Sequence, residues 1–233
     1  MEKKKLVVFT GAGVSADSGI ATFRDADGLW ANYRIEDVCT PEALARNREQ
    51  VIGFYNMRRR ELLASKPNAG HYALAGLEDM FDVRVITQNI DDLHERAGSR
   101  QVLHLHGELR KLRSTVDERL VFPIEGWEQK PDDRAPDGSP ARPFVVFFGE
   151  AVPNFERAAE IAAQADLMIV AGTSLAVYPA ASLVRYVPGG VPVYLVDPGE
   201  PDVRGLRNLK EHIRMRGAEG LPLLAARLRK EMD

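Results

Sequence analysis

Six short apolar runs, each ending at Gly, Thr, Ser, Asn or Asp, constrain the fold of this 233-residue chain most strongly. The runs are KLVVFT (5–10), VRVITQN (83–89), VLHLHG (102–107), FVVFFG (144–149), DLMIVAGTS (166–174) and VPVYLVD (191–197). Runs that are apolar on both faces are typical of buried parallel strands. Helical patterns lie between them, at 41–65, 68–80, 154–165 and 221–232. This alternation predicts an α/β fold with a doubly wound parallel sheet.

Two stretches do not fit this alternation. Residues 25–66 are mostly helical without an intervening strand, and residues 108–143 are polar, rich in Pro and Gly, and turn-like towards their end. We therefore expect one domain with two lobes. The sheet lobe would comprise 1–24, 67–107 and 144–233, and the inserted small lobe would comprise 25–66 and 108–143.

Composition and charge narrow the class of protein. The chain is 45% hydrophobic and 28% charged, as in an ordinary soluble globular protein. A net charge of −3 argues against non-specific nucleic-acid binding. The first apolar run is too short for a signal peptide, and no run has the length of a membrane span. Cys39 is the single cysteine, which excludes an internal disulfide. We expect a cytoplasmic monomer that binds neither nucleic acid nor membrane.

The stretch GAGVSADSGIATFRD, from Gly11 to Asp25, follows the first run. A strand, then glycines, then a helix is a pattern that cradles phosphate. It departs from the dehydrogenase fingerprint, because Ala16 replaces the third glycine and no strand ending in an acid follows about 20 residues later. Asp197 ends the last run, where it could accept ribose hydroxyls, and GTS (172–174) ends another. These three strand ends together favour a dinucleotide site.

Gln88, Asn89 and Asp91 cluster where the second run enters a loop. This edge of an open α/β sheet is the usual place for ligands. Asn and Asp side chains can hydrogen-bond a carboxamide, the group that nicotinamide carries. The same residues also fit an Asx turn with a helix N-cap at Asp91 or Asp92, and the sequence leaves both interpretations open.

His104 and His106 are two residues apart, so a strand running through both would point them to one face. Such a pair could ligate a metal, but no third ligand stands at a convincing spacing. His106 is the better catalytic candidate, because it ends the run beside Gly107, where its ring can face the crevice. A neutral imidazole near pH 7 suits removal of a proton from a sugar hydroxyl.

Five motifs, in chain order, resemble those of the sirtuins, which are NAD-dependent protein lysine deacylases. The motifs are GAGVSADSGIATFRD, TQNIDDLHERAG, HGEL, FGE and GTS. The match covers nearly the whole chain. ADGLW, EDVCTPEA, FYNMRRREL and VVFFGE are most similar to bacterial CobB-type sirtuins of class III. The resemblance implies a Rossmann-like sheet lobe and a reaction in which NAD is consumed, so that no hydride moves.

The resemblance also implies which residues contact NAD. In the glycine-rich stretch and the segment just after it, they are Gly11, Ala12, Ser15, Ile20, Phe23, Arg24 and Trp30. The nicotinamide pocket would be formed by Gln88, Asn89, Ile90 and Asp91. Phosphate, ribose and adenine would be contacted by Gly172, Thr173, Ser174, Asp197 and Ala218. Many sirtuins have Asn where this chain has Asp197.

His106 would be the general base of the implied reaction. The acyl oxygen of the substrate lysine attacks the anomeric carbon of the nicotinamide ribose, and His106 then assists a ribose hydroxyl. The products would be nicotinamide, O-acyl-ADP-ribose and free lysine. The acylated peptide would lie as an added strand between 145–150 and the loop 174–179. Its implied contacts are Val146, Phe147, Phe148, Gly149 and Glu150.

Tyr55 and Arg58 share a face of the predicted helix. The resemblance implies that they lie in the acyl pocket of sirtuins that remove succinyl and malonyl groups. A guanidinium pairs bidentately with a carboxylate, and a phenol adds a donor. We expect removal of succinyl and malonyl groups, with acetyl-lysine also accepted. In the alternative interpretation Tyr55 is a core residue and Arg58 one of three solvated arginines.

Most sirtuins hold a structural zinc with two C-x-x-C pairs, and this sequence departs from that pattern. Ser114 stands where the first ligand would fall, and no Cys or His follows up to Arg142. We therefore predict no bound zinc. We expect apolar residues to hold the small lobe instead, namely Leu112, Leu120, Val121, Phe122, Ile124 and Trp127.

Two other functions remain open from the sequence. One is an NAD-consuming protein ADP-ribosyltransferase, which uses the same bond cleavage. The other is a non-catalytic sensor that binds NAD or acyl-lysine. A dehydrogenase fits less well, since the acid expected after a second strand is missing.

Overall fold

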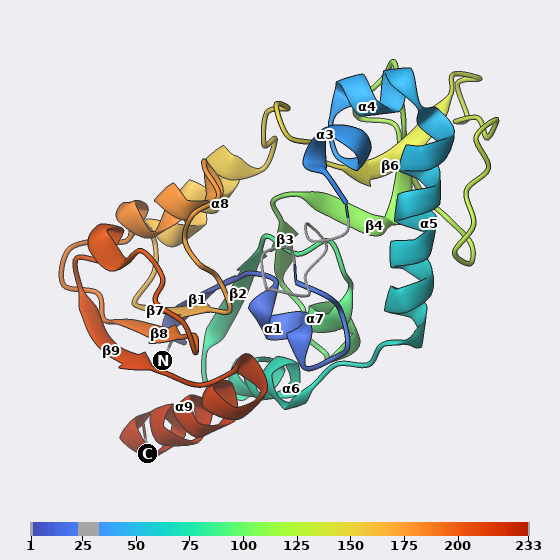
Figure 1. Cartoon of the computed structure of the whole chain (residues 1–233). Helices are drawn as coiled ribbons and strands as arrows, with labels where there is room; N and C mark the ends of the chain where they lie inside the picture. The colour runs from blue at the N-terminus through green and yellow to red at the C-terminus, as the bar shows by residue number, and fades with distance from the viewer. Residues whose placement is uncertain (1, 23–32, 233) are drawn as a thin grey trace.

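The computed structural model describes residues 2–22 and 33–232 (Figure 1). Within them, six strands form a parallel sheet in the order β3-β2-β1-β7-β8-β9. The strands are β1 (Lys5–Thr10), β2 (Asp82–Thr87), β3 (Val102–His104), β7 (Leu167–Ala171), β8 (Val193–Val196) and β9 (Leu209–Ile213). The strand order reverses between β1 and β7, so the predicted doubly wound sheet is confirmed.

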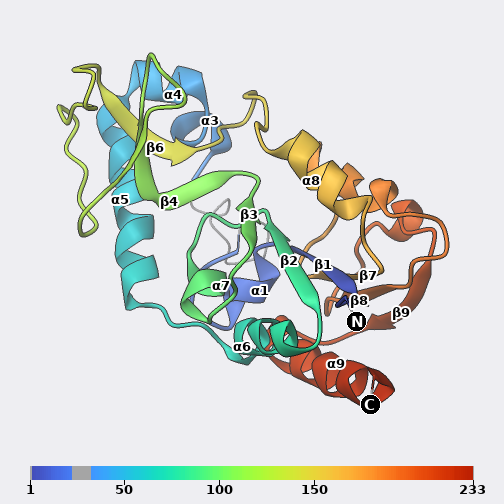
Figure 2. The same ribbon diagram turned by 180° about the vertical axis from the view of Figure 1, so that it is seen from behind.

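Helices cover both faces of this sheet (Figures 1 and 2). Leu6 and Val8 of β1 pack in a core with α6 (Ala69–Gly76) and α9 (Gly217–Met232). Val7 and Phe9 face the other way, into a core with α8 (Phe155–Ala162) and the 3-10 helix η2 (Ala180–Tyr186). The shorter helices are α1 (Gly13–Ala16), α7 (Leu93–Arg96), η1 (Leu77–Asp79) and η3 (Val203–Gly205). Burial on both faces explains why the strands are apolar throughout.

A second sheet has three antiparallel strands in the order β5-β4-β6. They are β4 (Gly107–Ser114), β5 (Val121–Pro123) and β6 (Ala141–Val145). Beside this sheet lie α3 (Ile35–Val38), α4 (Pro41–Arg46) and α5 (Arg48–Ala64), far from α9 in both views (Figures 1 and 2). The division of the chain into two lobes stays a prediction. Across the described residues, no helix has the length and apolar character needed to cross a bilayer.

Three predicted elements need correction. The run 144–149 is not a parallel strand, because β6 ends at Val145 and pairs antiparallel with β4. Its apolar pattern reflects burial against α5, which does not depend on strand direction. The run 102–107 is strand only to His104. The predicted helix 41–65 is broken at Asn47, whose side chain accepts a hydrogen bond from Gln50 N and caps α5. Strand β9 was not predicted, since this half-exposed edge strand lacks an apolar run.

The three-stranded sheet has its own small apolar core. Leu112, Ile124, Ala135 and Ala141 are buried together, and Leu120 and Phe122 pack against them. Four of the six residues expected to hold this region therefore do so. Val121 and Trp127 lie outside the cluster, and Trp127 instead lies under the guanidinium of Arg60, 4.0 Å from the ring centroid.

A cluster of hydrogen bonds around the buried Ser114 adds to this core. Ser114 is fully buried, and its hydroxyl donates to Asp137 Oδ2 (2.7 Å). The same oxygen accepts from the backbone N–H groups of Val116 (3.0 Å) and Asp117 (2.9 Å), and lies 2.8 Å from Ser139 Oγ. One hydroxyl thus joins the end of β4 to the loop that precedes β6.

We predict that Ser114→Ala lowers the thermal midpoint by about 2–8 °C. Losing the hydroxyl removes its hydrogen bonds to Asp137 and to the N–H groups of Val116 and Asp117 from a fully buried position, which costs about 1–2 kcal/mol in a chain of this size. Thr115→Ala, at the exposed neighbouring position, is the matched control and should shift the midpoint by less than about 1 °C. Equal midpoints for the two variants, measured by calorimetry, would show that Ser114 does not stabilise this region.

Candidate active site

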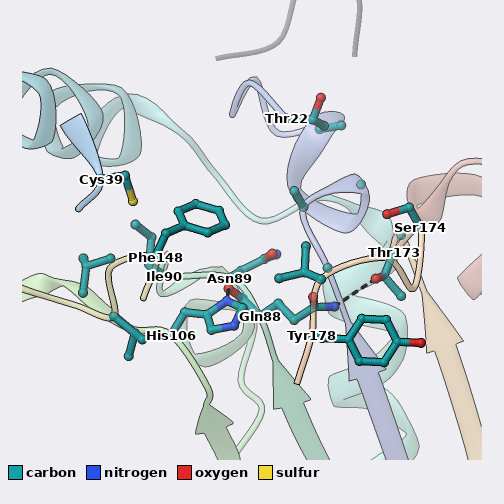
Figure 3. A pocket seen from close by; sticks show the side chains of 18 of the residues that line it. Thr22, Cys39, Gln88, Asn89, Ile90, His106, Phe148, Thr173, Ser174 and Tyr178 are labelled. Carbon is teal, nitrogen blue, oxygen red and sulfur yellow. Dashed lines mark hydrogen bonds between the residues drawn. The ribbon is translucent and has the colours of Figure 1, made fainter. Parts of the chain in front are cut away.

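A cavity of about 690 Å³ opens where β1, β2 and β7 end. This volume lies within the range of roughly 300–1,000 Å³ typical of ligand sites. Gln88 and His106 lie near its middle in Figure 3. Towards one end the figure shows Cys39, Ile90 and Phe148, and towards the other Thr173, Ser174 and Tyr178. The cavity therefore runs from the reversal point of the parallel sheet towards α5 and β6.

Glycines let two strand-end turns meet backbone to backbone at the reversal point. Gly13 N donates to Gly172 O (2.9 Å). A Cβ at Gly11 would lie 2.7 Å from that same oxygen, and Gly172 has a φ of +61°, which favours glycine. The contact brings Gly11, Ala12 and Thr173 into one wall of the cavity. These glycines are needed to bring the two turns together, as well as for any approach of phosphate.

His106 lies beyond the end of β3, and its ring position is set by a backbone carbonyl. Its Nδ1 lies 3.0 Å from Gln88 O. A carbonyl can only accept, so Nδ1 carries the proton and donates, and Nε2 of the neutral ring keeps its lone pair. Burial lowers the pKa of His106, and the bond to Gln88 O only partly offsets this. The ring is therefore a neutral base at pH 7.

Gln88 connects His106 to the other end of the cavity. Its backbone carbonyl holds the His106 ring, while its side-chain Nε2 donates to Thr173 Oγ1 (2.9 Å; Figure 3). Gln88 follows β2 and Thr173 follows β7, and these two strands lie on either side of β1. Their hydrogen bond therefore crosses the end of β1.

The ring of His104 is held by a partner at each of its two nitrogens. Its Nδ1 lies 2.8 Å from Asn89 O, and its Nε2 lies 2.7 Å from Glu95 Oε1. Burial would lower its pKa, but the hydrogen bond and charge of Glu95 outweigh burial and raise it. Both ring nitrogens are engaged, so His104 and His106 are not arranged as a pair of metal ligands. The expectation that one strand carries both rings is wrong, because β3 ends at His104.

A smaller adjoining cavity is lined by Ser15, Ile20, Asn89, Ile90 and Asp91. The Ser15 hydroxyl donates to Asp91 Oδ2 (3.0 Å) and accepts from Asn89 Nδ2 (3.1 Å). Asp91 Oδ1 accepts from Leu93 N (3.2 Å), and burial raises the pKa of this carboxyl. The Asx turn at Asp91 is therefore confirmed, and its place in a nicotinamide pocket stays a prediction.

Tyr55 and Arg58 lie in the wall of the main cavity on α5. Tyr55 is 2% exposed, stacks on Phe147 with ring centroids 5.8 Å apart, and has its hydroxyl 3.2 Å from Cys39 Sγ. Arg58 is also buried and lines both cavities, which makes the interpretation of a solvated arginine wrong. Its Nη1 lies 3.0 Å from Glu61 Oε2.

Residues 146–150 line the same cavity, as do Ser174, Val177, Tyr178 and Pro179 of the loop 174–179. Phe148 is 42% exposed, whereas Phe147 is core and its ring lies under the Arg142 guanidinium, 3.9 Å from the centroid. Val146 N donates to His106 O, and Phe148 N donates to Cys39 O. These two N–H groups are therefore already engaged within the chain.

The structure gathers most of the predicted site residues around the two cavities. The main one is lined by Gly11, Ala12, Tyr55, Arg58, Gln88, Asn89, Ile90, His106, Val146, Phe147, Phe148, Gly149, Glu150, Gly172, Thr173, Ser174 and Asp197. Ala218 lines neither cavity, and the adjacent Arg216 and Gly217 line the main one instead. Phe23, Arg24 and Trp30 lie outside the described residues.

Several lining residues were not predicted. Among them are Thr22, Ile35, Cys39 and Phe54. The sequence around them indicates helix or turn, but it does not show which way these segments face in the fold. Cys39 lies in the stretch 25–66, which the sequence predicts to be mostly helical, and its sulfur is 3.2 Å from the Tyr55 hydroxyl. The sequence signal that bears on its position is the helix N-cap at Thr40, the next residue, which places Cys39 just before the start of α4.

Known proteins resemble this chain over most of its length. Residues 11–179 match the sequence model of the Sir2 family. A protein of Aggregatibacter actinomycetemcomitans named NAD-dependent protein deacylase is 56% identical over 192 residues, covering 82% of this chain and 92% of the relative. A Bacteroides thetaiotaomicron protein of the same name is 53% identical over 220 residues, covering 92% and 93%. A solved complex of a Sir2 homologue with NAD superposes with a TM-score of 0.89 at 41% identity, covering 100% of this chain and 92% of that one.

Proposed function

Because the chain belongs to the Sir2 family, we propose that it is an NAD-dependent protein lysine deacylase that removes succinyl, malonyl and acetyl groups. The resemblance to sirtuins is thereby confirmed, while the acyl preference is our proposal. One observation carries it: a single cavity is lined by the glycine turns, by His106, and by Tyr55 with Arg58. Such a cavity can hold a dinucleotide and an acylated side chain together.

The residues of the cavity fit NAD. Small residues at the ends of β1 and β7 leave backbone and hydroxyl groups facing the cavity, as a diphosphate requires. Asp197, after β8, lines the same cavity and can accept from ribose hydroxyls. Asn89 lines the main cavity and offers an amide to a carboxamide, and Asp91 lies behind it beside an adjoining cavity of only about 20 Å³. When bound, NAD supplies an electrophilic sugar carbon with nicotinamide as the leaving group.

The chain's own residues then have separate tasks. His106 accepts a proton from a ribose hydroxyl at Nε2 and holds it while Nδ1 stays bonded to Gln88 O. Tyr55 and Arg58 orient the acyl group through hydrogen bonds to its distal carboxylate. Residues 146–150 and 174–179 bind the peptide backbone, which demands little of the surrounding sequence.

Product analysis tests this proposal against an ADP-ribosyltransferase and a sensor. With NAD and an acylated peptide, we expect mass spectrometry to find free lysine and O-acyl-ADP-ribose. A peptide or protein that gains ADP-ribose would favour transfer, and unchanged substrates would favour a sensor. Omitting NAD is the control, and it should leave the acylated peptide intact.

The proposal includes a small lobe that folds without zinc. In the ranges 2–22 and 33–232, no three His, Cys, Asp or Glu side chains are grouped to hold a metal ion. The Ser114 cluster and the apolar residues around Leu112 support this proposal. We expect elemental analysis of the purified protein to find well under about 0.1 zinc per chain, since Cys39 supplies the only thiolate. One tightly held zinc per chain would contradict it.

A further inference from the structure

Arg58, the guanidinium proposed to receive the acyl carboxylate, already has a carboxylate partner on its own helix. Arg58 Nη1 lies 3.0 Å from Glu61 Oε2, three residues further along α5. The two ends of this ion pair differ in environment. The Arg58 side chain is 5% exposed and lines the cavity, whereas Glu61 is 38% exposed and lines neither cavity. Glu61 thus approaches the guanidinium from the solvent side.

Asp91 is a second acidic group near Arg58. The charges of Glu61 and Asp91 both act on the Arg58 guanidinium, with that of Glu61 larger. Asp91 belongs to the floor of the adjoining cavity, where Ser15 and Leu93 N hold it. A substrate carboxylate at Arg58 would therefore join at least two described acids near one guanidinium, in a site largely shielded from water. Carboxylates that lie close together in a site shielded from water repel one another more strongly than they do in bulk water.

We propose that Glu61 determines the acyl selectivity of the site, because its carboxylate competes with that of a succinyl or malonyl group for Arg58. The inference rests on the proposed function. Binding an acidic acyl group requires Arg58 to share or release Glu61. An acetyl group carries no charge and leaves the ion pair intact. Glu61 therefore shifts the enzyme towards acetyl-lysine, and Arg58 shifts it towards acidic acyl groups.

The competition is specific to Arg58 among the acyl-pocket donors. The Tyr55 hydroxyl has Cys39 Sγ as its neighbour, a weak donor and acceptor that a carboxylate displaces easily. Glu61 holds a full charge at hydrogen-bond distance, and its partial exposure keeps the pair weak enough to exchange. Glu61 is thus the group whose removal should change selectivity most without emptying the pocket.

The test is Glu61→Gln, assayed on one peptide bearing acetyl-lysine or succinyl-lysine. We expect the ratio of kcat/KM for succinyl to that for acetyl to rise at least about threefold, mainly through a lower KM for the succinyl peptide. Using a ratio within one protein removes any effect of the fraction folded. Glu61→Ala, which cannot hydrogen-bond Arg58, should move the ratio in the same direction.

Two controls make the test specific. Glu49→Gln removes the same charge from an exposed position near the start of α5 and should leave the ratio unchanged. In an Arg58→Met background, Glu61→Gln should change the ratio by less than about 1.5-fold, because the competitor has lost its target. A rise that persists without Arg58 would assign the effect to general electrostatics and overturn the proposal.

The remaining outcomes separate this inference from the function on which it rests. If Glu61→Gln leaves the ratio unchanged or lowers it, Glu61 is inert or helps to orient Arg58, and the inference is wrong while the deacylase proposal stands. If the unaltered protein removes neither acyl group in the presence of NAD, the proposed function itself is wrong.

Discussion

Replacing His106 with Ala is expected to lower kcat/KM for deacylation at least about 100-fold, the usual contribution of a positioned general base. The ring lies in the middle of the cavity, and its Nδ1–H is committed to Gln88 O. Nε2 is therefore the nitrogen that accepts the proton, and burial keeps it unprotonated at pH 7 by lowering its pKa. Without this ring no other described side chain of the cavity is a neutral base.

NAD binding is the control for His106→Ala. The groups proposed to hold the dinucleotide lie mostly at the ends of β1, β7 and β8, so we expect the Kd for NAD from calorimetry to stay within roughly threefold. A variant that binds NAD normally and keeps more than about a tenth of the activity would remove His106 from the base role. A variant that loses NAD binding as well would point to a positioning role instead.

Arg58→Met is expected to reduce desuccinylation at least about tenfold more than deacetylation, measured as the two kcat/KM values on one peptide. Met keeps much of the length and apolar contact of the side chain but cannot donate to a carboxylate. A hydrogen bond to a charged group is worth about 1.5–3 kcal/mol, which corresponds to tenfold or more. Deacetylation should change little, because an acetyl group has no carboxylate to pair with the guanidinium.

Arg60→Met is the matched control for this prediction. Arg60 lies two residues from Arg58 on α5 but is exposed, with its guanidinium over Trp127 rather than in the cavity. It carries the same charge, so general electrostatic effects on an anionic substrate are common to both variants. Equal losses on succinyl and acetyl peptides in Arg58→Met would contradict the acyl-pocket role.

The three consecutive arginines show how far the sequence could predict the site. Helical spacing correctly put Tyr55 and Arg58 on one face, because that follows from helix geometry alone. It could not show that Arg59 is fully buried with its Nε donating to Leu109 O, since that contact depends on where β4 lies. For the same reason it could not identify Glu61 as the partner of Arg58.

The strands show the same limit. Apolar runs identified β1, β2, β7 and β8 because these strands are buried on both faces. The apolar run at 144–149 could not show that β6 is antiparallel. A strand buried against α5 has the same apolar sequence pattern as a parallel strand buried between two layers of helices. The apolar runs also missed β9, an edge strand. His106 was chosen as the end of a strand, yet it projects from the connection between β3 and β4.

Nicotinamide release tests the central claim most directly. In the proposed reaction, the bond between nicotinamide and ribose breaks only when an acylated lysine occupies the same cavity. Purified protein given NAD and acylated peptide should release one nicotinamide for each lysine freed, and almost none with the unacylated peptide. Lysine freed without nicotinamide, or nicotinamide released at the same rate with either peptide, would contradict the account.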